Sequence, residues 1–165
     1  MPPRTAYGFI LGAAILWCGA ILLAPALAAW EGAPRMLSAV LYRFFTPVCH
    51  QIDGRSFHLF GFPLAVCSRC SSIYIAFLAG TLLYPFVRDL RRPAMPSRTL
   101  LFVAVLPMVL DAGAAFLGIC DATFLSRTLT GAFFGLLMPF FIVPAAIEGA
   151  GQLFSPQLQK GTPDA

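Results

Sequence analysis

Four stretches of this chain are long, apolar and almost free of charge, and this feature restricts its fold more than any other. A helix that crosses the roughly 30 Å of bilayer hydrocarbon needs about 20 mostly apolar residues. The four stretches cover approximately residues 6–30, 67–87, 99–118 and 126–147. In a helix, every backbone hydrogen bond is made within the segment, as lipid requires. The sequence therefore predicts an all-α membrane protein, a bundle of four transmembrane helices.

The composition agrees with a surface that faces lipid. Of the 165 residues, 59% are hydrophobic and 11% are charged, whereas soluble domains have roughly 45–50% apolar and about 25% charged residues. A domain of this size cannot bury so many apolar side chains in one core. This excludes a nucleic-acid-binding protein, a secreted disulfide-rich domain and a disordered protein. The expected partner is the lipid bilayer, with a further membrane protein or a second copy of the chain left open.

The sequence predicts one membrane domain over residues 1–150 and a polar tail over residues 151–165. Residues 31–66 form a long connection between the first two transmembrane helices. This connection contains an amphipathic stretch, Arg35–Phe45, and a turn signal at Gly61 that predicts a short hairpin. Small residues four positions apart predict close contacts between helices. Three such pairs occur: Gly8 and Gly12, Ala76 and Gly80, and Gly131 and Gly135.

The distribution of arginine predicts the orientation. Four arginines occupy the short loop Arg88–Arg98, and short loops rich in Lys and Arg remain in the cytoplasm. We therefore expect a multi-pass protein of the plasma (inner) membrane with both termini in the cytoplasm. The first segment also resembles a signal peptide, because Ala26-Leu27-Ala28 has the form of a cleavage site. Its charge-free stretch exceeds the usual 7–15-residue signal core, which favours a retained helix.

The most specific chemical signal is the motif Cys67-Ser68-Arg69-Cys70 at the start of the second transmembrane helix. Cysteines at i and i+3 share a helix face, so both sulfurs can reach one metal ion or each other. The helix N-terminus and Arg69 favour the thiolate form. Cys49, with His50 beside it, precedes Cys67 by eighteen residues, an order typical of small zinc sites. We therefore predict that the zinc ligands come from Cys49, His50, Cys67 and Cys70, as three thiolates or as two thiolates and an imidazole.

The fourth ligand of this predicted zinc site stays open. Neighbouring residues in an extended chain point to opposite sides, so Cys49 and His50 are not expected to bind one ion together. His58, Asp111 or a water molecule are the alternatives for the fourth position. A protein ligand there indicates a structural site, whereas an open position indicates catalysis.

Three ionisable residues are predicted to form a polar pocket near the cysteines. Ionisable residues inside the bilayer are costly and usually functional. Asp111 belongs to the third predicted helix, and Arg69 and Arg127 begin the second and fourth helices on the same side. We expect Asp111 to pair with one arginine while the other faces a ligand, which makes the three residues candidates for a catalytic role. A buried ion pair that only fixes helix packing is the alternative.

Several of these motifs occur together in an order that resembles a known family. They are Cys49-His50-Gln51, Arg55-Ser56-Phe57, the turn at Gly61, Val66-Cys67-x-Arg69-Cys70 with Ile73-Tyr74, a late Asp, and Arg127-x-x-Thr130-Gly131-x-x-x-Gly135. The pattern resembles the small bacterial and archaeal membrane proteins classed as domain-of-unknown-function family 2085, over about Tyr42 to Leu136. The resemblance implies a multi-pass membrane protein with a shared Cys/His feature and implies no particular activity. Ser71-Ser72 and Ala112 depart from the family pattern, and neither departure removes a candidate ligand.

Three functions are compatible with these residues. The first is a zinc-binding membrane protein, favoured because thiolate and imidazole are the ligands that zinc prefers. The second is an enzyme, a quinone-linked thiol–disulfide oxidoreductase that uses Cys67 and Cys70, with Cys49 or Cys120 exchanging. The third is a non-catalytic transport or assembly subunit in which the Cys/His site only holds the loop. Cys18 and Tyr74 are expected to serve packing, and Asp121 is expected to be solvated.

Overall fold

The computed structural model describes residues 2–32, 35–91 and 94–154, with the side chains of residues 152–154 left aside. The described part of the chain is mostly helical, with connecting loops and one short hairpin. The helices are α1 (Pro3–Ala29), α2 (Arg35–Phe45), the 3-10 turn η1 (Asp53–Arg55), α3 (Ser68–Val87), α4 (Arg98–Phe116), α5 (Phe124–Leu137) and α6 (Pro139–Phe154). The strands are β1 (His58–Leu59) and β2 (Phe62–Pro63), which pair antiparallel.

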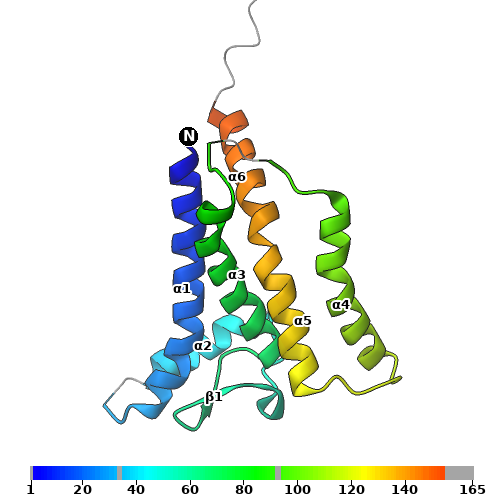
Figure 1. Cartoon of the computed structure of the whole chain (residues 1–165). Helices are drawn as coiled ribbons and strands as arrows, with labels where there is room; N and C mark the ends of the chain where they lie inside the picture. Colours follow the sequence, from blue (N-terminus) through cyan, green and yellow to red (C-terminus); the bar gives the residue numbers. More distant parts are fainter. Residues whose placement is uncertain (1, 33–34, 92–93, 155–165) are drawn as a thin grey trace, which may run out of the picture.

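Four helical spans in the described residues are long and apolar enough to cross a membrane. They are Pro3–Ala29, Ser68–Val87, Arg98–Phe116 and Phe124–Gly151. The last span joins α5 and α6, which continue as one rod (Figure 1). Pro139 occupies the first position of α6, where its missing N–H costs no helical hydrogen bond. The predicted class, an all-α membrane protein with four transmembrane helices, is confirmed.

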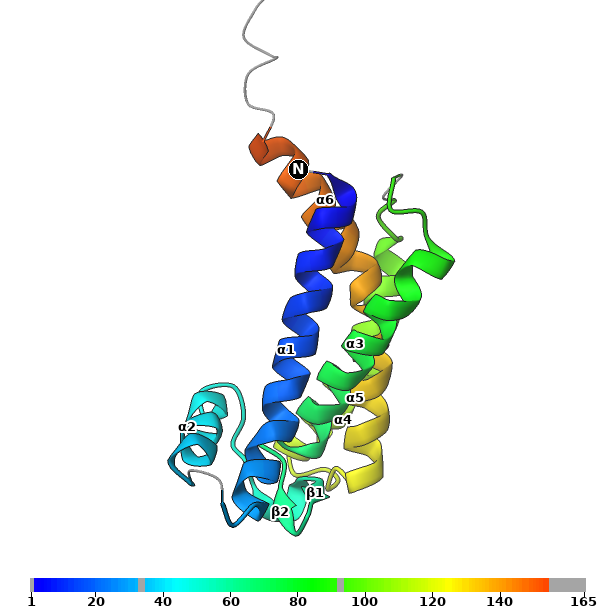
Figure 2. The ribbon, with the colours of Figure 1, turned by 90° about the vertical axis from the view of Figure 1, so that its left-hand side faces the viewer.

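The long helices lie side by side, with the start of α1 and the end of α6 at the same end of the bundle. Figures 1 and 2 show α1, α3 and the α5–α6 rod packed together, with α4 on the outer side of α5. The N-terminus, the end of α3 and the end of α6 lie at one end of the bundle, whereas α2 and the hairpin lie at the other. Ala104 is the one buried residue of α4 among those described, so this helix packs less closely against the bundle than the other long helices do.

Glycines allow α3 and α5 to approach closely. A Cβ atom added at Gly135 would lie 2.2 Å from the carbonyl oxygen of Ile73, and one at Gly131 would lie 2.6 Å from that of Arg69. A Cβ atom at Gly80 would likewise meet the carbonyl oxygen of Leu136. The small-residue motifs on α3 and α5 therefore form the predicted close contact.

Two sequence predictions differ from the structure. Gly8 and Gly12 were expected to form a helix contact, but a Cβ atom at either would meet nothing within 4 Å. The prediction is wrong because spacing alone does not determine which helix face meets a neighbour. The polar tail was expected from residue 151, yet α6 continues to Phe154, since Gln and Leu are good helix formers. Residues 155–165 of that tail lie outside the described residues.

The connection between α1 and α3 folds into a small layer at one end of the bundle. Its amphipathic helix, α2, covers Arg35–Phe45 as predicted, and the hairpin forms around Gly61. The hydroxyl of Ser38 on α2 donates to the carbonyl oxygen of Ala24 on α1 at 2.8 Å. Apolar side chains on the other face of α2 are exposed, as a helix lying at the membrane interface requires. They are Met36, Leu37, Val40 and Phe44.

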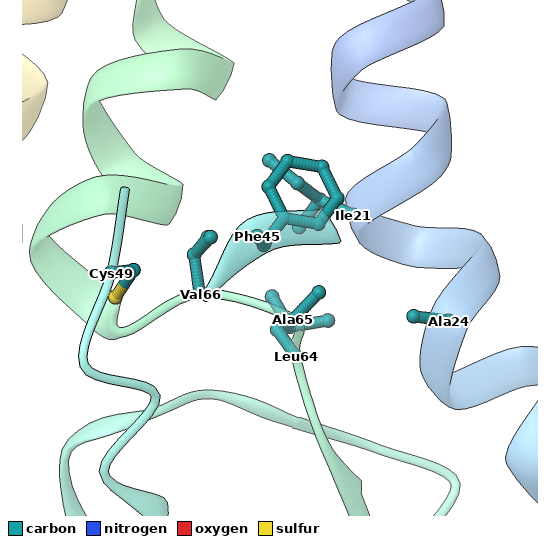
Figure 3. Close-up of a cluster of buried hydrophobic side chains, with 7 residues drawn as sticks. All are labelled: Ile21, Ala24, Phe45, Cys49, Leu64, Ala65 and Val66. Atoms are coloured by element: carbon teal, nitrogen blue, oxygen red, sulfur yellow. The ribbon is translucent and has the colours of Figure 1, made fainter. Parts of the chain in front are cut away.

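A compact apolar cluster fixes this layer against α1. Its buried members are Ile21, Ala24, Phe45, Cys49, Leu64, Ala65 and Val66. Figure 3 shows the ring of Phe45 next to Ile21 of α1, with Leu64 and Ala65 below the ring, and Val66 between Phe45 and Cys49, which lies beside the start of α3. Phe45, Ala65 and Val66 are fully buried. The cluster therefore holds the segment before α3 in place, and with it the start of the Cys67–Cys70 motif.

Candidate metal centre

Three cysteine sulfurs meet where α3 begins. Cys49 follows α2, and its N–H donates to the carbonyl oxygen of Phe45 at 3.0 Å, which continues the last turn of that helix. Cys67 is the N-cap residue of α3, and Cys70 lies in its first turn. The three Sγ atoms all lie within 4.8 Å of one another. The thiol of Cys49, eighteen residues before Cys67, thus lies beside the Cys67 and Cys70 pair that was predicted from the helical spacing.

Polar contacts hold the two segments that carry these thiols. The backbone N–H of Cys67 donates to Sγ of Cys49 at 3.1 Å. The side-chain amide of Gln51 donates to the carbonyl oxygens of Tyr42 at 2.7 Å and Ala65 at 2.8 Å. Gln51 has a left-handed backbone conformation, with φ at 51°. It therefore ties the chain just after Cys49 to both α2 and the segment that leads to Cys67.

The surroundings favour a thiolate at the mouth of α3. Cys49 is buried, and Cys67 and Cys70 are partly buried. Interaction with the Cys49 thiol, and then with the Cys70 thiol, lowers the pKa of Cys67 far below its ordinary value. Because thiolate is the form that binds metals and attacks disulfides, Cys67 is prepared for either chemistry.

The histidines are not part of the group of three sulfurs. His50 is exposed and lies on the wall of the cavity beside them. His58 is on the hairpin, where its Nε2 lies 3.1 Å from Oδ1 of Asp53. His58, one of the alternatives for the fourth ligand, therefore contacts Asp53 and not the sulfurs. His50 lies at the edge of the site.

The structure brings Asp111 of α4 to Arg69 of α3 as an ion pair. The two side chains keep 13% and 20% of their exposure, so Asp111 does not face lipid. Arg127, in the first turn of α5, donates from Nε to the carbonyl oxygen of Ala122 at 3.0 Å. The pairing of Asp111 with one arginine agrees with the expectation, and a ligand facing the other arginine stays a prediction.

A cavity of about 320 Å³ connects these groups. Its wall includes the three thiols and three guanidinium groups, together with His50. The lining residues are Val48, Cys49, His50, Ile52, Arg55, Cys67, Arg69, Cys70 and Arg127. The thiols therefore border a space that can admit a small ligand.

The remaining cysteines lie apart from this group. Cys120 is exposed in the loop between α4 and α5, beside the exposed Asp121. Cys18 is buried in α1, and its thiol donates to the carbonyl oxygen of Tyr74 at 3.4 Å. The ring of Tyr74 packs edge-on against Trp17, with ring centroids 5.6 Å apart. Cys18 and Tyr74 thus hold α1 against α3.

Comparison with known proteins finds a family that covers the residues described above. A family model described as "Predicted membrane protein (DUF2085)" matches residues 49–141. The chain belongs to this family. A relative from Methanocaldococcus jannaschii, "Uncharacterized protein MJ1492", is 34% identical over 114 residues, which cover 69% of this chain and 73% of the relative. No solved structure matches the chain.

The family segment contains every group of the candidate centre. It begins at Cys49 and ends within α6, so the thiols, the Arg69–Asp111 pair and Arg127 all belong to it. Sequence reasoning did not assign two contributors, Gln51 and Arg55. Both stand in the motifs that carried the resemblance, but nothing in their spacing indicates a hydrogen-bonded bridge or a place on a cavity wall.

Proposed function

We propose that this integral membrane protein binds one soft divalent metal ion, with zinc preferred, through Cys49, Cys67 and Cys70. The observation that carries the proposal is the mutual approach of the three Sγ atoms within 4.8 Å. Thiolates are soft ligands that select zinc over calcium or magnesium. Two of them come from one helix turn and the third from a separate segment, so metal binding would also fix the connection to the bundle.

The spacing of the sulfurs suits a tetrahedral ion. A Zn–S bond of about 2.3 Å places the sulfurs of a tetrahedral site about 3.8 Å apart. The three Sγ atoms, all within 4.8 Å of one another, are compatible with that separation. The N–H of Cys67, which donates to Sγ of Cys49, would remain as an outer hydrogen bond of the kind that orients metal ligands.

The fourth position of the proposed ion would face the cavity. Asp111 is paired with Arg69, and His58 lies against Asp53, so neither fills it. His50, on the cavity wall, or a water molecule would complete the coordination. Three protein ligands with an exchangeable fourth are typical of catalytic zinc, which favours a reactive site over a purely structural one.

The same thiols are suited to disulfide exchange. In that reaction Cys67 and Cys70 would form a disulfide, and two electrons and two protons would pass to a quinone, which becomes a quinol. The lowered pKa of Cys67 would serve this chemistry too. A non-catalytic transport or assembly subunit would use the metal only to hold the connection.

Metal analysis combined with thiol counting separates the first two functions. We expect the purified full-length protein to contain about one zinc ion per chain, with the three thiols protected from a maleimide until a chelator is added. Cys120, which is exposed, should react in both states and provides the internal control. A metal-free protein with a Cys67–Cys70 disulfide would overturn the zinc proposal and favour the oxidoreductase.

A further inference from the structure

The cavity beside the thiols carries a concentration of positive charge that a metal site alone does not require. Arg55 of η1, Arg69 of α3 and Arg127 of α5 all contribute to its wall. Three separate segments of the chain therefore bring guanidinium groups to one small space. The described residues that line it include no aspartate or glutamate.

Neutralisation of this charge by the protein is incomplete. Asp111 pairs with Arg69, and it is the one carboxylate that contacts these three arginines in the described part of the chain. One carboxylate therefore faces three guanidinium groups, and a thiolate at Cys67 on the same wall would still leave one positive charge in excess. Such an excess at the end of a membrane helix bundle attracts an anion, and the attraction is strong where walls of low dielectric constant surround it.

A buried donor at this wall lacks an acceptor. Nε of Arg69 is buried and has no hydrogen-bond partner among the described residues. A buried N–H group without an acceptor costs free energy, and in native proteins such groups are usually satisfied. Arg69 is one of the residues of the cavity wall, and a small rotation of its side chain would let an oxygen atom bound in the cavity accept from this donor.

The start of α3 adds to the effect. Cys67 caps this helix without a side-chain hydrogen bond to its first N–H groups. Those N–H groups carry the positive end of the helix dipole, and Cys67, Arg69 and Cys70 of this turn all belong to the cavity wall. The contribution is secondary to that of the guanidinium groups, but it has the same sign.

We propose that the cavity binds a phosphate-type oxyanion, held by Arg55 and Arg127 and accepting a hydrogen bond from Nε of Arg69. Guanidinium groups bind phosphate oxygens through paired, charge-assisted hydrogen bonds. A space of about 320 Å³ accommodates a phosphate group with a small substituent. The position beside the thiols would place the anion next to the open site of the metal, and this part rests on the proposed function. The arginine contacts do not depend on the metal.

Two sources supply this chemistry, namely the phosphate headgroup of a membrane lipid and a soluble phosphate. We would titrate the detergent-solubilised full-length protein with inorganic phosphate and, separately, with dihexanoyl phosphatidic acid, using calorimetry. Saturable binding of at least one probe is expected. Binding of inorganic phosphate identifies a soluble ligand, and binding of the short-chain lipid alone identifies a headgroup. Absence of binding by both probes would overturn the proposal.

Substitutions locate the binding. Arg55→Gln alters an exposed residue and should weaken binding about tenfold or more, as loss of a charge-assisted hydrogen bond does. Arg127→Lys keeps the charge but loses the paired geometry, and should weaken binding to a smaller extent. Arg43→Gln is the matched control, because Arg43 is exposed on α2 at the same end of the molecule and does not line the cavity. Equal weakening by Arg43→Gln would show non-specific attraction and overturn the proposal.

Repeating the titration with zinc-loaded and chelator-treated protein distinguishes the two proposals. Anion binding that is lost in Arg55→Gln but found in a protein that holds no metal would support the oxyanion site and refute the zinc site. Zinc binding without any anion binding would support the zinc site and refute the oxyanion site. If both stand, zinc should tighten anion binding, because a cation offsets the charge of the thiolates, and the anion should tighten zinc binding by the same factor.

Discussion

Replacement of Cys67 by serine should abolish metal binding and, with it, the response of the protein to chelators. Serine nearly keeps the size of the side chain but removes one of the three sulfurs that approach one another. A ligand present at a thousand times its Kd stabilises the folded state by about 4 kcal/mol. We therefore expect the wild-type protein to lose several degrees of thermal stability when zinc is removed. The variant should contain less than about a tenth of an ion per chain and show no such loss.

Cysteine 120 provides the matched control for this result. Its side chain is exposed in the loop between α4 and α5, away from the three sulfurs. Cys120→Ser should therefore retain both the metal and the chelator response. Equal metal content in Cys67→Ser and the wild type, measured by elemental analysis, would contradict the assignment of Cys67 as a ligand.

Replacement of Gly135 by alanine should separate α3 from α5. The added Cβ atom would lie 2.2 Å from the carbonyl oxygen of Ile73 and 2.9 Å from its Cα. Both contacts are with helix backbone, which cannot rotate away as a side chain can. Overpacking of this kind costs typically 1–3 kcal/mol and occasionally more. We expect about 3 kcal/mol, measured as a lower midpoint of thermal unfolding in detergent.

The same change at Gly12 should behave in the opposite way. A Cβ atom at Gly12 meets nothing within 4 Å, and alanine favours a helix over glycine by up to about 1 kcal/mol. Gly12→Ala should therefore leave the unfolding midpoint unchanged or raise it slightly. A fall in the midpoint as large as that of Gly135→Ala would show that α1 packs more closely than the structure indicates.

The parts of this fold that follow from local pattern could be predicted from the sequence. The four spans depend on length and hydropathy, and α2 depends on amphipathic spacing that ends before Pro47. The meeting of Cys67 and Cys70 follows from helical geometry, and Asp111 was placed near Arg69 by counting turns from the helix ends. These inferences hold because each needs only one element or the thickness of the bilayer.

The parts that depend on tertiary contacts could not be predicted. Gln51 bridges two carbonyl oxygens from a left-handed backbone conformation, and a non-glycine residue gives no local signal for that conformation. Gly8 and Gly12 have the spacing of a contact motif but face no neighbour. The directions of Cys49 and His50 were expected to differ, and the structure has the first buried and the second exposed.

X-ray absorption at the zinc edge of the purified protein tests the central claim most directly, because it reports which atoms surround the ion. We predict three sulfur neighbours at about 2.3 Å and one lighter nitrogen or oxygen neighbour. A zinc environment of nitrogen and oxygen atoms alone would contradict a site built from Cys49, Cys67 and Cys70.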